Sequence, residues 1–110
     1  MWGGGLPGVN PLNTPLSFSF ATAMVKGGSN GFVLKGGNAN AGPLHTAYDG
    51  PRPPGYQPMR KEGAIILGIG GDNSNHALGT FFEGVMTAGL STDAADDAVQ
   101  ASIVAAGYAL

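Results

Sequence analysis

The chain has 110 residues, the length of one domain, and a formal net charge of −2 with only five basic side chains. So few Lys and Arg residues do not form the basic patch that nucleic-acid binding requires. It contains no cysteine, which excludes disulfides, thiolate zinc sites and thiol nucleophiles within these residues. Its apolar runs are far shorter than the ~20 residues that cross a bilayer. We expect a folded, loop-rich protein with no nucleic-acid or membrane partner.

The N-terminal part predicts an irregular segment followed by a strand. Residues 1–15 are rich in Gly and Pro and lack periodicity, so the predicted domain covers residues 16–110. Met1 is followed by Trp2 and three glycines, which does not match a secretion signal. In residues 16–25 apolar and small side chains alternate, which is the period of a half-buried strand.

The middle of the chain predicts one short strand and a long loop. Gly and Asn residues at 27–31 favour a turn, and a second strand is expected at residues 32–34. Residues 36–58 are poorly periodic, and four prolines lie within positions 51–58; proline is excluded from helix interiors and central strands. They therefore predict a loop, and a loop of this length is usually functional or disordered.

Two further strands and one helix are expected in the second half. Residues 64–67 form a continuous apolar run typical of a buried strand, and residues 80–87 are rich in strand-forming types. A helix is expected at residues 92–106, capped by Ser91 or Thr92. Gly107 is expected to end it, and residues four positions apart are expected to line its buried face: Ala95, Val99 and Ile103.

This order of elements predicts an all-β fold. Several antiparallel strands, long loops and one short C-terminal helix are typical of part of an antiparallel β-sandwich.

The residues best suited to carry out catalysis lie at positions 68–83, in the sequence GIGGDNSNHALGTFFE. Asp72 follows the apolar run and precedes a polar loop, where a carboxylate can act as a general acid or base. Burial there would raise its pKa and let it hold a proton near neutral pH. The alternative is a turn in which the Asp72 side chain only accepts backbone hydrogen bonds. Composition alone leaves both interpretations open.

Metal and phosphate sites fit this segment less well. Asp72 and Glu83 occupy the first and twelfth positions of a calcium loop, but Ala77 stands where that loop requires glycine. The segment lacks the Gly-Lys-Ser/Thr sequence that a phosphate-binding loop requires. No second His or Cys lies near His76 at the spacing expected of two metal ligands. We therefore predict no metal and no cofactor, and Glu83 is expected to be a strand residue.

Longer motifs resemble one known family. The matching stretches are KEGAIILGIGGDNSN (61–75), GTFFEGVMTAG (79–89) and AVQASIVAAGYA (98–109), with KGGNA from Lys35 resembling an RGGNA sequence. The chain from about residue 16 onward resembles the C-terminal part of the catalytic domain of glycoside hydrolase family 54, the α-L-arabinofuranosidases B.

The resemblance implies a secreted, retaining enzyme that removes terminal α-L-arabinofuranosyl units from arabinan and arabinoxylan. It implies a two-sheet antiparallel β-sandwich, with the family's sugar-binding trefoil domain not contained in these 110 residues. Asp72 falls on the family's general acid/base, and Gly71 falls on a residue whose backbone contacts the sugar. Retention also requires a nucleophilic carboxylate at about 5–5.5 Å from the acid/base.

The nucleophile is not found at its expected place. Aligning the start of the chain with the family's nucleophile motif would put Trp2 where that glutamate belongs. The family's paired cysteines are also missing from these residues. The sequence therefore leaves two interpretations open, an incomplete catalytic domain and a non-catalytic remnant that binds carbohydrate weakly.

Overall fold

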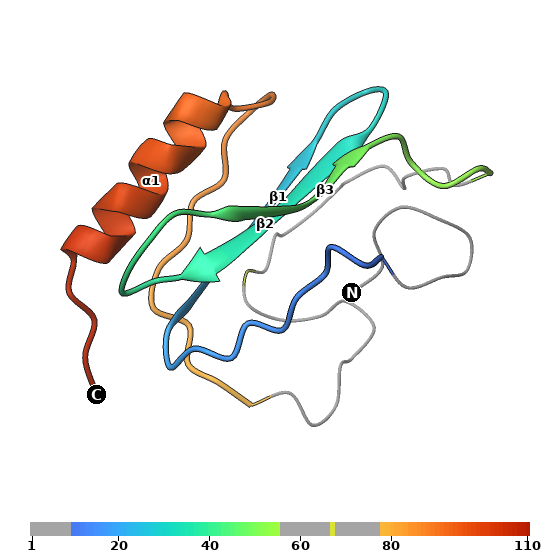
Figure 1. Ribbon diagram of the computed structural model, residues 1–110. Helices are drawn as coiled ribbons and strands as arrows, with labels where there is room; N and C mark the ends of the chain where they lie inside the picture. The colour runs from blue at the N-terminus through green and yellow to red at the C-terminus, as the bar shows by residue number, and fades with distance from the viewer. Residues whose placement is uncertain (1–9, 56–66, 68–77) are drawn as a thin grey trace. The chain divides into compact units, whose positions relative to one another are not determined.

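The computed structural model describes residues 10–55, 67 and 78–110 (Figure 1). The chain divides into two compact units, Met1–Tyr56 with Ala88–Leu110, and Gln57–Thr87. All regular elements among the described residues lie in the first unit. They are β1 (Ala21–Gly27), β2 (Phe32–Asn38), β3 (His45–Gly50) and α1 (Asp93–Ala105).

The three strands form one antiparallel sheet in the order β1-β2-β3. Thr22 pairs with Gly37 and Met24 pairs with Lys35, and paired residues point to the same face of a sheet. Lys26 lies two positions after Met24 and shares this face. The same face of the sheet therefore presents two lysines, one from β1 and one from β2.

A bulge in β3 changes the register beside Lys35. Leu34 pairs with Tyr48 but Lys35 pairs with Thr46, so Ala47 is the extra residue on β3. The Ala47 carbonyl accepts a hydrogen bond from Asn10 Nδ2 at 2.7 Å. The segment before β1 is tied to the far edge of the sheet in this way.

Helix α1 begins and ends as its sequence predicts. Thr92 has extended backbone angles, and its hydroxyl accepts a hydrogen bond from the Ala95 amide, which defines the N-cap. Beyond the C-cap Ala106, Gly107 has a φ of 69°, a left-handed conformation that glycine adopts without strain. The predicted capping by Thr92 and the ending at Gly107 are confirmed.

The buried face of α1 is polar, and the predicted apolar face is wrong. Asp96 and Gln100 are only 1% and 2% exposed, whereas Ala95 is exposed and Val99 is 36% exposed. Gln100 Nε2 donates to the carbonyls of Asn38 and Gly42, in the connection between β2 and β3. The helix packs through hydrogen bonds because the sheet beneath it offers lysines and carbonyls.

The apolar core of the described residues is correspondingly small. It consists of Phe20, Ala39 and Ala47, while four polar residues are equally buried: Thr22, Lys35, Asp96 and Gln100. The Phe20 ring stacks on Tyr108 beyond the helix, with 5.6 Å between ring centroids. Polar contacts therefore carry much of the packing between the helix and the sheet.

Two predicted segments in the first unit need correction. The strand expected at 16–25 begins only at Ala21, and the predicted loop at 36–58 contains the end of β2 and all of β3. Glycine in β2 is explained by packing, because a Cβ on Gly36 would lie 3.1 Å from Leu16 Cδ2 and one on Gly37 would lie 3.0 Å from the Pro43 carbonyl oxygen. Close packing on this strand overrides the low strand propensity of glycine.

Of the two strands expected later in the chain, one does not form and the other lies mostly outside the described residues. Residues 80–87 are described and form no strand, because no described segment pairs with them and propensity alone does not make a strand. Of the run at 64–67 only Leu67 is described, in a bend with its side chain 42% exposed. The rest of that run lies outside the described residues.

The predicted fold class is confirmed at the level of an antiparallel sheet with one C-terminal helix. A second sheet, as a sandwich requires, stays a prediction. Within the described part of the chain, no helix is long and apolar enough to span a membrane.

Candidate active site

Most of the predicted site residues lie outside the described residues. Trp2, Gly71, Asp72 and His76 belong to this group, so their predicted roles stay predictions. Glu83 is described, is exposed, and lies in a segment without regular secondary structure rather than in the expected strand. The second carboxylate of the segment is therefore accessible to solvent.

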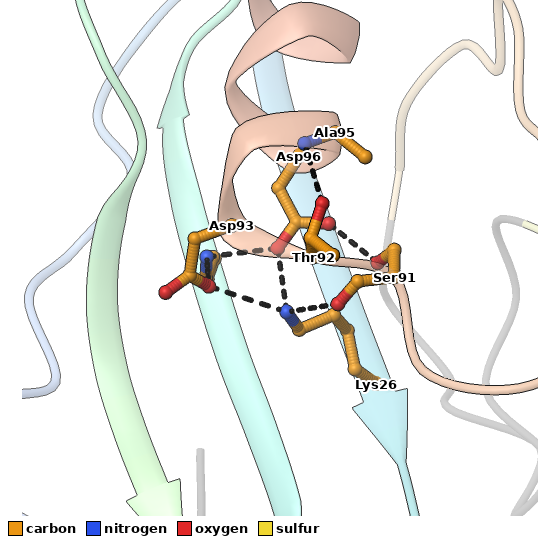
Figure 2. A network of polar contacts seen from close by, with 7 residues as sticks. Lys26, Ser91, Thr92, Asp93, Ala95 and Asp96 are labelled. Atoms are coloured by element: carbon orange, nitrogen blue, oxygen red, sulfur yellow. Dashed lines mark hydrogen bonds and ion pairs between the residues drawn. The ribbon is translucent and has the colours of Figure 1, made fainter.

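The described residues contain one dense cluster of charged side chains, in the first unit (Figure 2). Lys26 Nζ lies 2.7 Å from Asp96 Oδ2 and 3.3 Å from Asp93 Oδ1. Lys35 Nζ lies 2.8 Å from the same Asp96 oxygen and 2.7 Å from Asp93 Oδ1. We call these four residues together with Ser91 the lysine–aspartate cluster.

Three elements bring this cluster together. Lys26 comes from β1, Lys35 from β2, and both aspartates from the first turn of α1. Ser91, just before the helix, donates from its hydroxyl to Asp96 Oδ1 at 2.5 Å and accepts from Lys26 at its carbonyl. Both Asp96 carboxylate oxygens are thus bonded, as a buried charge requires.

Hydrogen bonding fixes the ionisation of the cluster. Burial by itself would raise the pKa of Asp96, but hydrogen bonds from both lysines and from Ser91 outweigh it and hold this pKa well below its usual range. The pKa of Lys26 is raised chiefly by its hydrogen bond to Asp96. The pKa of Lys35 is raised by its hydrogen bonds to Asp93 and then Asp96.

The Asp93 side chain differs from Asp96 in its surroundings. It is 81% exposed, and its pKa is lowered by hydrogen bonds from Lys35 and then Lys26. Near neutral pH both lysines are therefore protonated and both aspartates ionised. No group of the cluster is ready to exchange a proton, so the cluster holds the helix on the sheet and is unsuited to general acid/base catalysis.

The sequence contained a partial signal for this cluster. Lys26 lies at an even position of β1, in phase with the buried Phe20 and Thr22, so strand periodicity places its side chain inward. From its place in the first turn of α1, Asp96 is expected only to interact favourably with the positive end of the helix dipole. Its pairing with lysines about 60–70 residues earlier cannot be predicted from the sequence without the tertiary structure.

Within residues 10–55, 67 and 78–110, no group of three or more His, Asp or Glu side chains is placed to hold a metal ion.

The sequence model of the family described as α-L-arabinofuranosidase B, catalytic, matches residues 1–109. The chain belongs to this family. The family match includes the residues predicted to form the catalytic site, Gly71 and Asp72, although it does not by itself assign their roles.

Individual members of the α-L-arabinofuranosidase B family are similar over nearly the whole chain. An α-L-arabinofuranosidase of Hypocrea jecorina is 55% identical over 112 residues, covering 100% of this chain. An α-L-arabinofuranosidase B of Aspergillus oryzae is 57% identical over 109 residues, covering 96% of this chain. In both cases the chain spans only 22% of the relative's length.

Solved structures of the family agree with the fold. An arabinofuranosidase in complex with arabinofuranosyl-α-1,2-xylobiose is 54% identical and superposes with a TM-score of 0.79. The match covers 90% of this chain and 21% of that one. A glycoside hydrolase family 54 enzyme soaked with a cyclic sulfate inhibitor gives the same values.

Proposed function

We propose that this chain supplies the acid/base part of the active site of a retaining α-L-arabinofuranosidase. The observation that carries the proposal is the family match over residues 1–109. It is supported by the 55% identity to an α-L-arabinofuranosidase along the whole chain. Since the chain spans about a fifth of its relatives' length, the activity belongs to a complete catalytic domain.

In the proposed mechanism Asp72 acts twice. Protonated, it donates its proton to the glycosidic oxygen as the bond to the anomeric carbon breaks, while a second carboxylate attacks that carbon. Ionised, it then removes a proton from the water that releases the sugar. Gly71 would contact the sugar through its backbone, since a residue without a side chain allows close approach.

The nucleophile of this mechanism is proposed to come from residues other than these 110. Aligning the start of the chain with the family's nucleophile motif would put Trp2 at that place, and an indole offers only an N–H donor. Without a nucleophile the first displacement has no group on the enzyme to capture the anomeric carbon.

The proposed substrate class is a terminal α-L-arabinofuranosyl unit on a plant polysaccharide. The solved complex of a relative contains arabinofuranosyl-α-1,2-xylobiose, an arabinofuranosyl unit on a xylose backbone. Enzymes acting on polymers outside the cell must be exported, so we propose an extracellular location.

A segment exchange tests the proposed function. The segment of the Hypocrea jecorina enzyme that matches residues 16–110 would be replaced by these residues, so that residues 1–15 with Trp2 are left out, and hydrolysis of 4-nitrophenyl α-L-arabinofuranoside would be measured. We expect the chimera to be active and the isolated 110-residue chain to be inactive. In the chimera, Asp72→Asn should lower the hydrolysis of a substrate with a basic leaving group by roughly 10²–10⁴-fold, the usual contribution of a general acid.

The matched control is Asp97→Asn, which makes the same chemical change on the exposed side of α1. It should leave activity unchanged. A chimera with the circular dichroism of the parent enzyme but no activity would instead support a non-catalytic remnant.

A further inference from the structure

We propose that Asn30 is a site of spontaneous covalent modification, in which its side-chain amide is lost and an aspartyl or isoaspartyl residue forms. The inference does not depend on the proposed function. It rests on the chemistry of the turn between β1 and β2.

The sequence provides the reactive dipeptide at one position. Of the seven asparagines in the chain, only Asn30 is followed by glycine. A glycine on the C-terminal side leaves the backbone nitrogen unshielded and the backbone free to rotate, so this nitrogen can reach the asparagine carboxamide.

The turn leaves both reacting groups available. Asn30 is exposed, and it borders a hollow of about 330 Å³ together with Ser29 and Asp49, so water reaches it. Gly31 accepts a hydrogen bond at its carbonyl from the Gly28 amide at 3.0 Å. The Gly31 amide itself makes no hydrogen bond to the residues that the structure describes, so the attacking nitrogen is not held in a ladder.

A positive charge beside the turn favours the reaction. The Arg52 guanidinium donates to the carbonyls of Gly28 and Ser29. The backbone amide of Gly31 must lose its proton before it attacks, and a nearby cation stabilises the resulting negative charge.

Loss of the Asn30 side-chain amide needs no reactant other than water. The Gly31 nitrogen forms a bond to Asn30 Cγ, the bond from that carbon to the side-chain nitrogen breaks, and ammonia leaves. Water then opens the five-membered imide at either carbonyl, giving aspartate or isoaspartate at position 30. The product carries one more negative charge, and the isoaspartyl form inserts an extra carbon into the backbone of the turn.

Two other sites in the described residues serve as internal comparisons. Asn40 is also exposed, but it is followed by Ala41 and its Nδ2 donates to the Tyr108 carbonyl. Asp49 precedes Gly50, but that glycine lies in β3 and pairs with Phe32. Both should react more slowly than Asn30.

The test is incubation of the 110-residue chain at neutral and mildly alkaline pH, followed by tryptic digestion and mass spectrometry. The peptide of residues 27–35 contains Asn30 as its only asparagine, and the peptide of residues 36–60 contains Asn38 and Asn40. We expect the first peptide to show, before the second, the mass increase that accompanies replacement of NH by O. The rate should be proportional to the hydroxide concentration. An isoaspartyl product should be detected there by enzymatic methylation.

Asn30→Gln should abolish the mass gain in this peptide. Equal rates at Asn30 and Asn40, or modification of Asn30 only in denaturant, would overturn the proposal.

Discussion

Asp96 is the most buried charged side chain of the described structure. The free-energy cost of burying its carboxylate depends on the groups that bind it. Only 1% of the residue is exposed, and its carboxylate binds Lys26, Lys35 and Ser91. A buried charge that loses its partners is costly, whereas a bonded one is tolerated. The cluster is therefore a point where a single substitution has a large effect.

Neutralising Asp96 should strongly destabilise the chain. Asp96→Asn leaves two buried lysine ammonium groups with weaker acceptors, and breaking a buried ion pair costs roughly 3–5 kcal/mol. Urea unfolding followed by the helical circular dichroism signal measures the loss. The exposed Asp97→Asn should change the free energy of unfolding by less than about 0.5 kcal/mol. Equal effects of the two variants would show that the cluster does not hold the helix.

The cluster also predicts how stability depends on pH. The pKa of Asp96 is lowered by folding, so its contribution is present above the unfolded value of about 3.9 and is lost as pH falls below it. The pKa values of Lys26 and Lys35 are raised, so their contribution is present below about 10.4 and is lost as pH rises through the folded values. Stability from the cluster should be constant between about pH 5 and pH 9.

Urea unfolding at a series of pH values checks this expectation. The acid loss should be much smaller in Asp96→Asn than in the unchanged chain. An identical acid loss in the two proteins would assign it to other carboxylates.

At the scale of the element, the N-cap of α1 has a measurable share in stability. Thr92→Ala removes the acceptor of the Ala95 amide, and such caps are worth about 1 kcal/mol. Thr92→Ser keeps the hydroxyl and should restore most of the loss in thermal unfolding. Failure of serine to restore stability would mean that the threonine methyl group, not the cap, is responsible.

The ends of the helix were predictable from sequence, but its buried face was not. Thr92 and Gly107 act through local backbone geometry, which sequence reports directly. The face is chosen by what lies opposite, and Lys26 and Lys35 select Asp96 over the apolar Val99. These lysines lie about 60–70 residues before the helix, so the sequence of the helix does not reveal which face is buried.

The sheet shows the same division. The predicted alternation holds only in part, because Phe20, just before β1, and Thr22 are buried whereas Phe18 is 44% exposed. The sequence does not predict β3, because the prolines after it argue against regular structure throughout the region, whereas in the structure they only follow the strand, which ends at Gly50. Gly36 and Gly37 concealed the length of β2, because their fit to neighbouring residues is a tertiary effect.

At the scale of the whole molecule, the candidate site depended on family resemblance. Composition could not separate Asp72 as a turn residue from Asp72 as a proton donor. A retaining mechanism needs two carboxylates from distant parts of a chain, and these residues cover about 22% of the relatives' length. Local patterns therefore could not reveal the complete site.

The most direct test of the account is the leaving-group dependence of Asp72→Asn in the chimeric enzyme. The measurement is kcat/KM for two aryl α-L-arabinofuranosides, one with the acidic 4-nitrophenol and one with a more basic phenol. Only the poor leaving group needs protonation as its bond breaks, and kcat/KM reports this step. We predict that Asp72→Asn slows the substrate with the basic phenol far more than the 4-nitrophenyl substrate. Equal slowing of both substrates would contradict the assignment of Asp72 as the general acid/base.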